Sequence, residues 1–276
     1  MTRILVFGDS FVFGIGVDEP HVFTARLEDL LNREESSAGR YEVLNMGVSG
    51  YSTDQELILF EELAPRLAPD LVILVACDND FEGNTQDFIY QRYYKPFFVL
   101  DGHGSLLLKN TPVPTLDRTQ ATKLWLSQHS NAWNFMRSRR TSHARVSAFL
   151  DLFQVGVARP PTDDPVELMF ALTRAFRSAA EAIGASFLTM NTGHRAEQTP
   201  LFQSLRPLLR RDGTQFLGLE GALAEARRAQ PSHYWDFRHD THWNIDSHRL
   251  AAEIVFTYLQ ARDERVAPGR RVTRSP

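Results

Sequence analysis

The sequence predicts an α/β fold in which strands and helices alternate around a parallel sheet. Short strand-like runs alternate with stretches of helical apolar spacing in the first third of the chain, and this alternation resumes after residue 165. The run DLVILVAC, Asp70–Cys77, is apolar almost throughout, as expected of a strand buried on both faces of a parallel sheet. The 276 residues are 43% hydrophobic, which is typical of an ordinary globular protein.

The first third contains three predicted strands separated by two predicted helices. The strands are Arg3–Phe7, Glu42–Asn45 and Asp70–Cys77. The helices are His21–Arg33 and Thr53–Leu67, with Pro69 marking the exit of the second. This order predicts right-handed crossovers between parallel strands.

The last 110 residues continue the same pattern. Residues Val166–Ile183 form a predicted helix, and Ser186–Asn191 form a predicted strand. Further helices are expected over Leu201–Arg211, Leu219–Ala229 and Ile245–Ala261, the last with Asn244 as its N-cap. We therefore predict one domain over residues 1–262, followed by a flexible tail over 263–276.

The alternation breaks between residues 84 and 165, which we interpret as an inserted cap. Two apolar runs flank Asp101-Gly102-His103-Gly104 and predict a β-hairpin, and Leu124–Arg139 has helical spacing. This region also holds an aromatic cluster that forms either the core of the cap or a wall of a ligand pocket. Its members are Phe88, Tyr90, Tyr93, Tyr94, Phe97 and Phe98.

Charge and composition exclude several functional classes. The formal net charge is −4 and the pI is near 6.1, so nucleic acid is not an expected partner. We interpret a cluster of basic residues as the solvated face of a helix. The cluster consists of Arg137, Arg139, Arg140 and Arg145. The single cysteine, Cys77, permits no intrachain disulfide, and no apolar run reaches the roughly 20 residues of a membrane span. The first strand is too short for a signal-peptide core, so the expected location is cytoplasmic.

A serine follows the first predicted strand, in the segment RILVFGDSFVFGIG. Reactive groups of an open parallel sheet collect beyond the carboxyl ends of its strands, and Ser10 lies at such an end. A serine hydroxyl needs a base within hydrogen-bond reach to become a nucleophile. His242, immediately before the last helix, is the candidate base, and Asp240 is the candidate acid that orients it.

Two further loops offer hydrogen-bond donors for an oxyanion. The segment NMGVSG follows the second strand and provides the backbone N–H of Gly47, whereas CDND ends the third strand and provides the amide of Asn79. Such donors, aimed at one point together with the Ser10 N–H, stabilise the negative charge of a tetrahedral intermediate.

These four blocks, GDS, NMGVSG, CDND and DTHWN, resemble in order those of the SGNH (GDSL-like) hydrolase superfamily. The resemblance implies a flavodoxin-like three-layer α/β/α sandwich and ester hydrolysis without a metal or other cofactor. It implies Ser10 as nucleophile, His242 as base, and an oxyanion hole formed by Ser10, Gly47 and Asn79. Neighbours of the blocks are the expected substrate contacts: Asp9, Phe11 and Trp243.

Two positions depart from the family pattern. Cys77 stands where the third block usually has glycine, and we expect only a packing change there. His239 stands where the family aspartate usually precedes the histidine by three residues, so that Asp240 is two residues before His242. This D-x-H-W spacing resembles that of the alginate O-acetylation proteins. The transfer of an O-acyl group to a sugar hydroxyl is therefore an alternative to hydrolysis.

Other readings of the same residues remain open. Ser10 and Asn79 are also suited to capping helices, His242 to a structural role, and Asp236 to the place of Asp240. Cys77 could act as a thiol nucleophile, and the side chains around 233–248 include metal-capable groups, although their spacing is not that of a zinc protease.

The predicted function is that of a serine esterase, which cleaves short O-acyl esters of a sugar or small metabolite through a Ser–His–Asp triad. The alternatives are an O-acyltransferase that uses the same residues and a non-catalytic binder of a glycan or metabolite. The expected partner is therefore a small-molecule or glycan ester.

Overall fold

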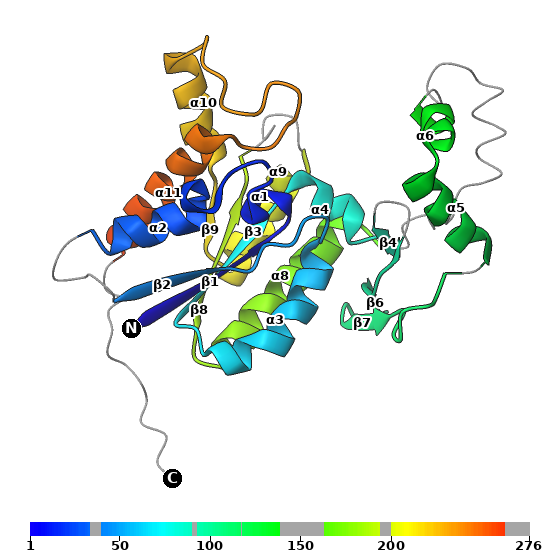
Figure 1. Cartoon of the computed structure of the whole chain (residues 1–276). Helices are drawn as coiled ribbons and strands as arrows, with labels where there is room; N and C mark the ends of the chain where they lie inside the picture. Colours follow the sequence, from blue (N-terminus) through cyan, green and yellow to red (C-terminus); the bar gives the residue numbers. More distant parts are fainter. Residues whose placement is uncertain (34–39, 90–92, 117, 139–162, 194–199, 263–276) are drawn as a thin grey trace.

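The computed structural model describes residues 1–33, 40–89, 93–116, 118–138, 163–193 and 200–262. At its centre lies a five-stranded sheet with the order β2-β1-β3-β8-β9, in which every neighbouring pair is parallel (Figure 1). The strands are β1 (Thr2–Gly8), β2 (Tyr41–Asn45), β3 (Leu71–Ala76), β8 (Ser186–Asn191) and β9 (Phe216–Leu217). The predicted α/β fold with a parallel sheet is confirmed.

Three helices cover one face of the sheet: α2 (Phe23–Leu31), α10 (Glu220–Ala229) and α11 (Ile245–Gln260). Alternate residues of β1 point to opposite faces, so Ile4 and Val6 pack here with Phe23 and Val255. All four side chains are fully buried.

The opposite face is covered by α3 (Thr53–Leu67) and α8 (Pro165–Ala182). Phe7 of β1 meets Phe60 of α3 and Phe176 of α8, with ring centroids 5.6 and 5.4 Å from its own. Helices therefore flank the sheet on both sides, and the three-layer α/β/α sandwich is confirmed.

Several short elements escaped the sequence prediction. They are α1 (Ser10–Phe13), the 3₁₀ turn η1 (Glu19–His21) and α4 (Asp78–Gly83), together with β9. Each is shorter than two helical turns or three strand residues, which is too short to show a hydrophobic period. Helix α9 (Pro200–Asp212) matches its prediction to within one residue at each end.

The region that we interpret as an insertion begins with small antiparallel elements. Strands β4 (Phe88–Ile89) and β5 (Tyr93–Tyr94) pair, and β6 (Phe97–Leu100) pairs with β7 (Leu106–Lys109). The second pair is the predicted hairpin, which Asp101 closes by accepting backbone N–H groups of His103 and Ser105 at 2.8 Å.

The helical part of the insertion differs from the prediction of a single helix over Leu124–Arg139. It consists of α5 (Arg118–His129) and α6 (Asn131–Ser138), which lie apart from the central sheet in Figure 1. Ser130 separates them because its Oγ accepts the N–H of Trp133 at 3.2 Å, as an N-cap does. Arg139, Arg140 and Arg145 of the basic cluster lie outside the described residues, as does the tail 263–276.

The aromatic cluster does not form one unit. Phe98 is buried and joins the core beneath α3 and α8, whereas Tyr93 is exposed. The ring centroids of Phe88 and Tyr94 lie 4.4 Å apart, with the rings tilted by 34°. Tyr90 lies outside the described residues.

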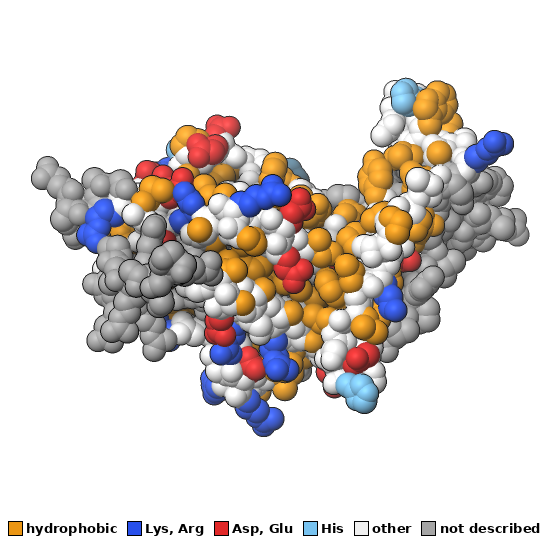
Figure 2. Space-filling model, turned by 90° about the horizontal axis from the view of Figure 1, so that it is seen from below, with side chains coloured by type: hydrophobic (Ala, Val, Ile, Leu, Met, Phe, Trp, Pro, Cys, Tyr) orange, Lys and Arg blue, Asp and Glu red, His pale blue; other side chains and the backbone are white. Residues whose placement is uncertain are grey.

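Hydrophobic side chains gather on the surface shown in Figure 2. The exposed ones of the insertion are Tyr93, Leu107, Leu108, Val113, Trp125 and Phe135. None of the described helices is long and apolar enough to span a membrane.

Candidate active site

The candidate site lies at the carboxyl ends of three adjacent strands. Ser10 follows β1, Gly47 follows β2, and Asn79 follows β3. The strand order reverses direction between β1 and β3, and this reversal opens the crevice in which open α/β sheets bind ligands. The fold therefore brings together three loops, all from the first 80 residues, at one edge of the sheet.

Ser10, His242 and Asp240 form a continuous hydrogen-bonded chain. The Nε2 atom of His242 lies 2.7 Å from Ser10 Oγ, and its Nδ1 atom lies 2.5 Å from Asp240 Oδ1. Ser10 and His242 are 232 residues apart in the sequence. When Nδ1 carries the hydrogen that Asp240 accepts, Nε2 is left to accept the proton of Ser10.

Asp240 contacts His242 twice, since Oδ1 also accepts the His242 backbone N–H at 3.0 Å. These hydrogen bonds from His242 hold the pKa of Asp240 below its usual value. Asp236, the other upstream carboxylate, accepts a hydrogen bond from Arg227 at 3.0 Å. His239 is exposed to solvent. The structure thus pairs His242 with Asp240 and leaves Asp236 and His239 outside this contact.

The loop that carries His242 is fastened at both ends. Asp236 forms an isolated antiparallel bridge with Trp243, and the Phe237 N–H donates to the carbonyl of His242 at 3.0 Å. At its exit, Asn244 caps α11 as predicted by accepting the N–H groups of Asp246 and Ser247.

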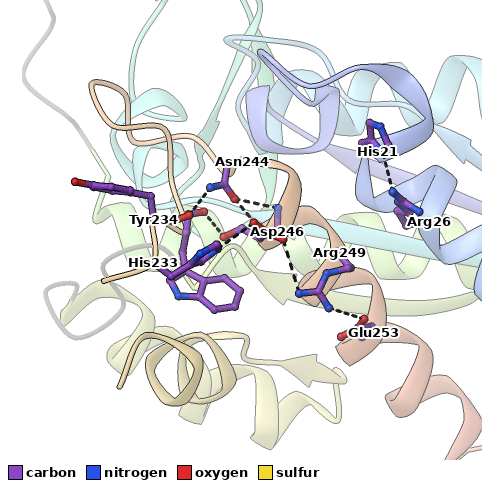
Figure 3. Close-up of polar contacts among 10 residues, drawn as sticks. His21, Arg26, His233, Tyr234, Asn244, Asp246, Arg249 and Glu253 are labelled. Atoms are coloured by element: carbon purple, nitrogen blue, oxygen red, sulfur yellow. Dashed lines mark hydrogen bonds and ion pairs between the residues drawn. The ribbon is translucent and has the colours of Figure 1, made fainter. Parts of the chain in front are cut away.

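Figure 3 shows the polar contacts that hold this exit from outside. Asn244 Nδ2 donates to the carbonyl of Tyr234, and His233 Nε2 lies 3.0 Å from Asp246 Oδ2. Arg249 pairs with Asp246 and, at 2.9 Å, with Glu253 of the next turn. The loop before α11 is thereby anchored on its own helix.

Two aromatic residues that we expected to contact substrate are buried below the imidazole. Phe11 is 5% exposed and Trp243 is fully buried. The Phe11 ring centroid lies 5.0 Å from that of His242 and 5.4 Å from that of Trp243. Trp243 therefore offers no surface to a ligand in this structure. Its ring packs against Phe11, which in turn lies against the His242 imidazole.

Asp9, the third expected substrate contact, is also inside the protein, at 1% exposure. Its Oδ1 accepts the Phe11 N–H at 2.9 Å and so caps α1, and its Oδ2 accepts the amide of Asn79 at 3.1 Å. Burial raises the pKa of Asp9, and these hydrogen bonds oppose that rise. Asp9 therefore ties the helix that carries Ser10 to the side chain of Asn79.

The expected oxyanion donors have partners of their own in this structure. The N–H of Gly47 donates to Asn45 Oδ1 at 2.9 Å, and one amide hydrogen of the exposed Asn79 goes to Asp9. Ser10 opens α1, so its N–H has no partner inside that helix. Sequence reasoning missed Asn45, whose Nδ2 also donates to the carbonyl of Val12 at 2.7 Å. Its place as the first residue of the block NMGVSG was the available signal.

The rival nucleophile and the metal reading find no support in the described residues. Cys77 is 5% exposed, and burial raises the pKa of its thiol well above the usual value, which makes a thiolate unfavourable. Within the described ranges, no group of three or more His, Cys, Asp or Glu side chains is arranged to hold a metal ion.

Comparison with known proteins agrees with the fold. The structure is similar to that of TesA, with a TM-score of 0.50 at 13% identity over 94% of this chain and 99% of that one. A catalytic mutant of the acetylxylan esterase Axe2 from Geobacillus stearothermophilus gives a TM-score of 0.48 at 14% identity, over 98% and 97% of the two chains. No curated protein matches the sequence significantly. The sequence model of the GDSL-like lipase/acylhydrolase family matches residues 6–250. The chain belongs to the GDSL-like lipase/acylhydrolase family.

Proposed function

We propose that this hydrolase is a serine esterase that removes short O-acyl groups from a sugar or a small metabolite, with Ser10 as nucleophile. The observation that carries the proposal is the 2.7 Å contact between Ser10 Oγ and His242 Nε2, with Asp240 on the other ring nitrogen. Ser10 is only 8% exposed, and this restricted access favours a small acyl group.

In the proposed first step, Ser10 Oγ attacks the ester carbonyl carbon while His242 Nε2 takes its proton. The carbonyl oxygen becomes an oxyanion. It is held by the N–H groups of Ser10 and Gly47 and by Asn79. An amide has two N–H donors, so Asn79 can hold Asp9 with one and the oxyanion with the other. The Gly47 N–H exchanges Asn45 for the oxyanion when substrate binds.

The intermediate then collapses. The bond between the carbonyl carbon and the alcohol oxygen breaks, His242 returns its proton to the leaving alcohol, and the acyl group stays on Ser10. Water then attacks the acyl carbon while His242 Nε2 takes one of its protons. The bond between the acyl carbon and Ser10 Oγ breaks, His242 returns the proton to Ser10 Oγ, and the carboxylic acid leaves. Asp240 stabilises the imidazolium in both halves.

The test is hydrolysis of p-nitrophenyl esters from acetate to octanoate by the wild type and Ser10→Ala. We expect turnover that falls with chain length, survives a chelator and drops by about 10⁴-fold or more in Ser10→Ala. Ser105→Ala, the same change in the exposed hairpin loop, is the matched control and keeps wild-type turnover. Undiminished turnover in Ser10→Ala would overturn the assignment of the nucleophile.

The O-acyltransferase alternative uses the same acyl-enzyme and differs in the second step. Adding an acceptor alcohol separates the two, because a transferase passes the acyl group to the alcohol whereas an esterase releases the free acid. A wild type that hydrolyses no ester and forms no acyl adduct on Ser10 by intact mass would support the non-catalytic binder instead.

A further inference from the structure

Ionisable side chains are buried behind the candidate site to an unusual degree. Four carboxyls, from the end of β1, from α3 and from α4, are at most 1% exposed: Asp9, Asp54, Glu56 and Asp80. Lys95, which follows β5 in the insertion, is 2% exposed. Buried charges are costly unless they are paired or neutralised, so the charge state of this cluster needs an explanation.

Two of these carboxyls hold the helices on which the candidate catalytic groups lie. Asp9 caps α1, which begins with Ser10. Asp80 Oδ2 accepts the Cys77 N–H at 2.8 Å, in a capping box at the start of α4, which carries Asn79. A displacement of either carboxyl therefore moves a group at the reaction centre.

The one buried cation of the cluster is already engaged with Asp54. Lys95 Nζ contacts Asp54 Oδ2, and Asp54 Oδ1 accepts the Gln55 N–H at 2.8 Å. Among the described residues, no hydrogen-bond partner reaches either oxygen of Glu56 or the Oδ1 atom of Asp80. Glu56 is thus buried without a hydrogen-bond donor from the described residues, and it interacts electrostatically with three other carboxyls.

The electrostatic surroundings of Glu56 oppose its ionisation. Burial raises its pKa well above the usual value, and the negative charges of Asp80, Asp9 and Asp54 raise it further. Lys95 acts in the opposite direction and more weakly. A protonated carboxyl has one O–H donor, and a neighbouring carboxylate is its strongest acceptor.

We propose that Glu56 is a positioning residue of the active site: as an uncharged carboxylic acid it donates a hydrogen bond to Asp80 Oδ1 and thereby fixes α4 and Asn79. The proposed proton removes the repulsion that Asp80 and Glu56 exert on each other as two buried carboxylates. Its loss would put a second negative charge beside Asp80 and displace the start of α4. The kinetic part of this inference rests on the proposed esterase function.

The protonation state is tested by infrared difference spectroscopy at neutral pH, which needs no substrate. The wild type is expected to show the C=O stretching band of a protonated carboxyl, and Glu56→Gln is expected to lose it. Glu62→Gln, the same change at an exposed position of α3, keeps the band. Identical spectra of the wild type and Glu56→Gln in this region would overturn the proposal.

The positioning role is tested by kinetics. Glu56→Ala is expected to lower kcat by about 10- to 100-fold with little change in KM, because Asn79 shifts from its place. Glu56→Gln keeps an uncharged N–H donor and restores kcat. It also removes the loss of activity that ionisation of Glu56 causes in the wild type at alkaline pH.

The two proposals fail separately. If kcat falls in the same way at alkaline pH in Glu56→Gln and in the wild type, Glu56 does not position the site. This conclusion leaves the proposed esterase function intact. If the wild type hydrolyses no ester, the proposed function fails, and the infrared band still decides whether Glu56 carries the proton.

Discussion

The Phe23 N–H donates to His248 Nδ1 at 3.2 Å, which joins the start of α2 to the first turn of α11. His248 is 1% exposed, and its ring stacks on Phe23 and meets Trp243 edge-on at 5.4 Å. The imidazole is therefore a neutral hydrogen-bond acceptor inside the core, six residues beyond His242. Burial lowers its pKa from 6.5 to about 4.

This lowered pKa predicts a pH dependence of stability. As pH falls from 6.5 to 4, the unfolded chain takes up a proton at His248 that the folded protein does not accept. The contribution of His248 to the free energy of unfolding is therefore complete above pH 6.5 and falls by up to about 3 kcal/mol as the pH approaches 4.

His248→Asn keeps an acceptor near Nδ1 and does not titrate, so its unfolding free energy should depend less steeply on pH in this window. Urea unfolding at several pH values measures the slope. His103→Asn, at an exposed histidine of the β6–β7 hairpin, is the control and keeps the wild-type slope. Equal slopes for all three proteins would contradict the prediction.

Asp240 provides a second prediction, because its side chain is half exposed, at 50%. Replacing a buried triad aspartate by asparagine costs about 10⁴-fold in kcat, and we expect about 10²-fold for Asp240→Asn because water partly replaces the carboxylate. Steady-state hydrolysis of p-nitrophenyl acetate measures the change. Asp18→Asn, at another exposed aspartate, should leave kcat unchanged. A kcat of Asp240→Asn equal to that of the wild type would remove Asp240 from the mechanism.

Gly47 provides a third prediction through its contact with α1. A Cβ atom at this position would lie 2.4 Å from Phe13 N and 2.7 Å from the carbonyl carbon of Val12, which are both backbone atoms. Gly47→Ala should therefore cost about 1–3 kcal/mol of stability and lower kcat, since α1 carries Ser10. Gly102→Ala is the control, because nothing lies within 4 Å of its Cβ. Thermal unfolding measures the loss of stability, and steady-state hydrolysis measures kcat. Equal values of both for Gly47→Ala and Gly102→Ala would contradict the prediction.

The buried ion pair provides a fourth prediction. Lys95→Met leaves Asp54 in the core without its cation and should cost about 3–5 kcal/mol, whereas adding Asp54→Asn should recover most of that loss. A double-mutant cycle on urea unfolding measures the coupling. Strictly additive losses in the double variant would show that the two side chains do not stabilise each other.

The long elements of the fold could be read from the sequence because hydrophobic patterning dominates them. The helix Thr53–Leu67 was predicted at its observed bounds, and β3 shows the continuous apolar run of a doubly buried strand. Helices α1 and α4 could not be predicted in this way, since hydrogen bonds to Asp9 and Asp80 create them. The stretch Leu124–Arg139, predicted to be helical, is helical in two parts up to Ser138, because Ser130 caps a second helix inside the pattern.

At the site, the sequence motifs identified Ser10, His242 and Asp240, which the structure brings into contact across most of the chain. The sequence did not predict which residues near these motifs are buried. Trp243 adjoins His242 in the chain, but its ring turns into the core, where it packs against α2. Lys95 gave no signal either, because a single lysine between aromatic residues has no periodicity that would place its ammonium group inside the protein.

The burial of Lys95 also limits how much of the region 84–165 can be removed from the protein. Removing residues 84–165 in one piece would take away Lys95 and also Asn84, whose Oδ1 accepts the Asp54 N–H at 3.0 Å. Asn110, beyond the hairpin, donates to the carbonyl of Lys95 at 2.6 Å. Asn84, Lys95 and Asn110 are thus part of the hydrogen-bond and ion-pair network around Asp54. A loop graft or a shortened chain that keeps these three residues therefore keeps the contacts that they make with the buried cluster.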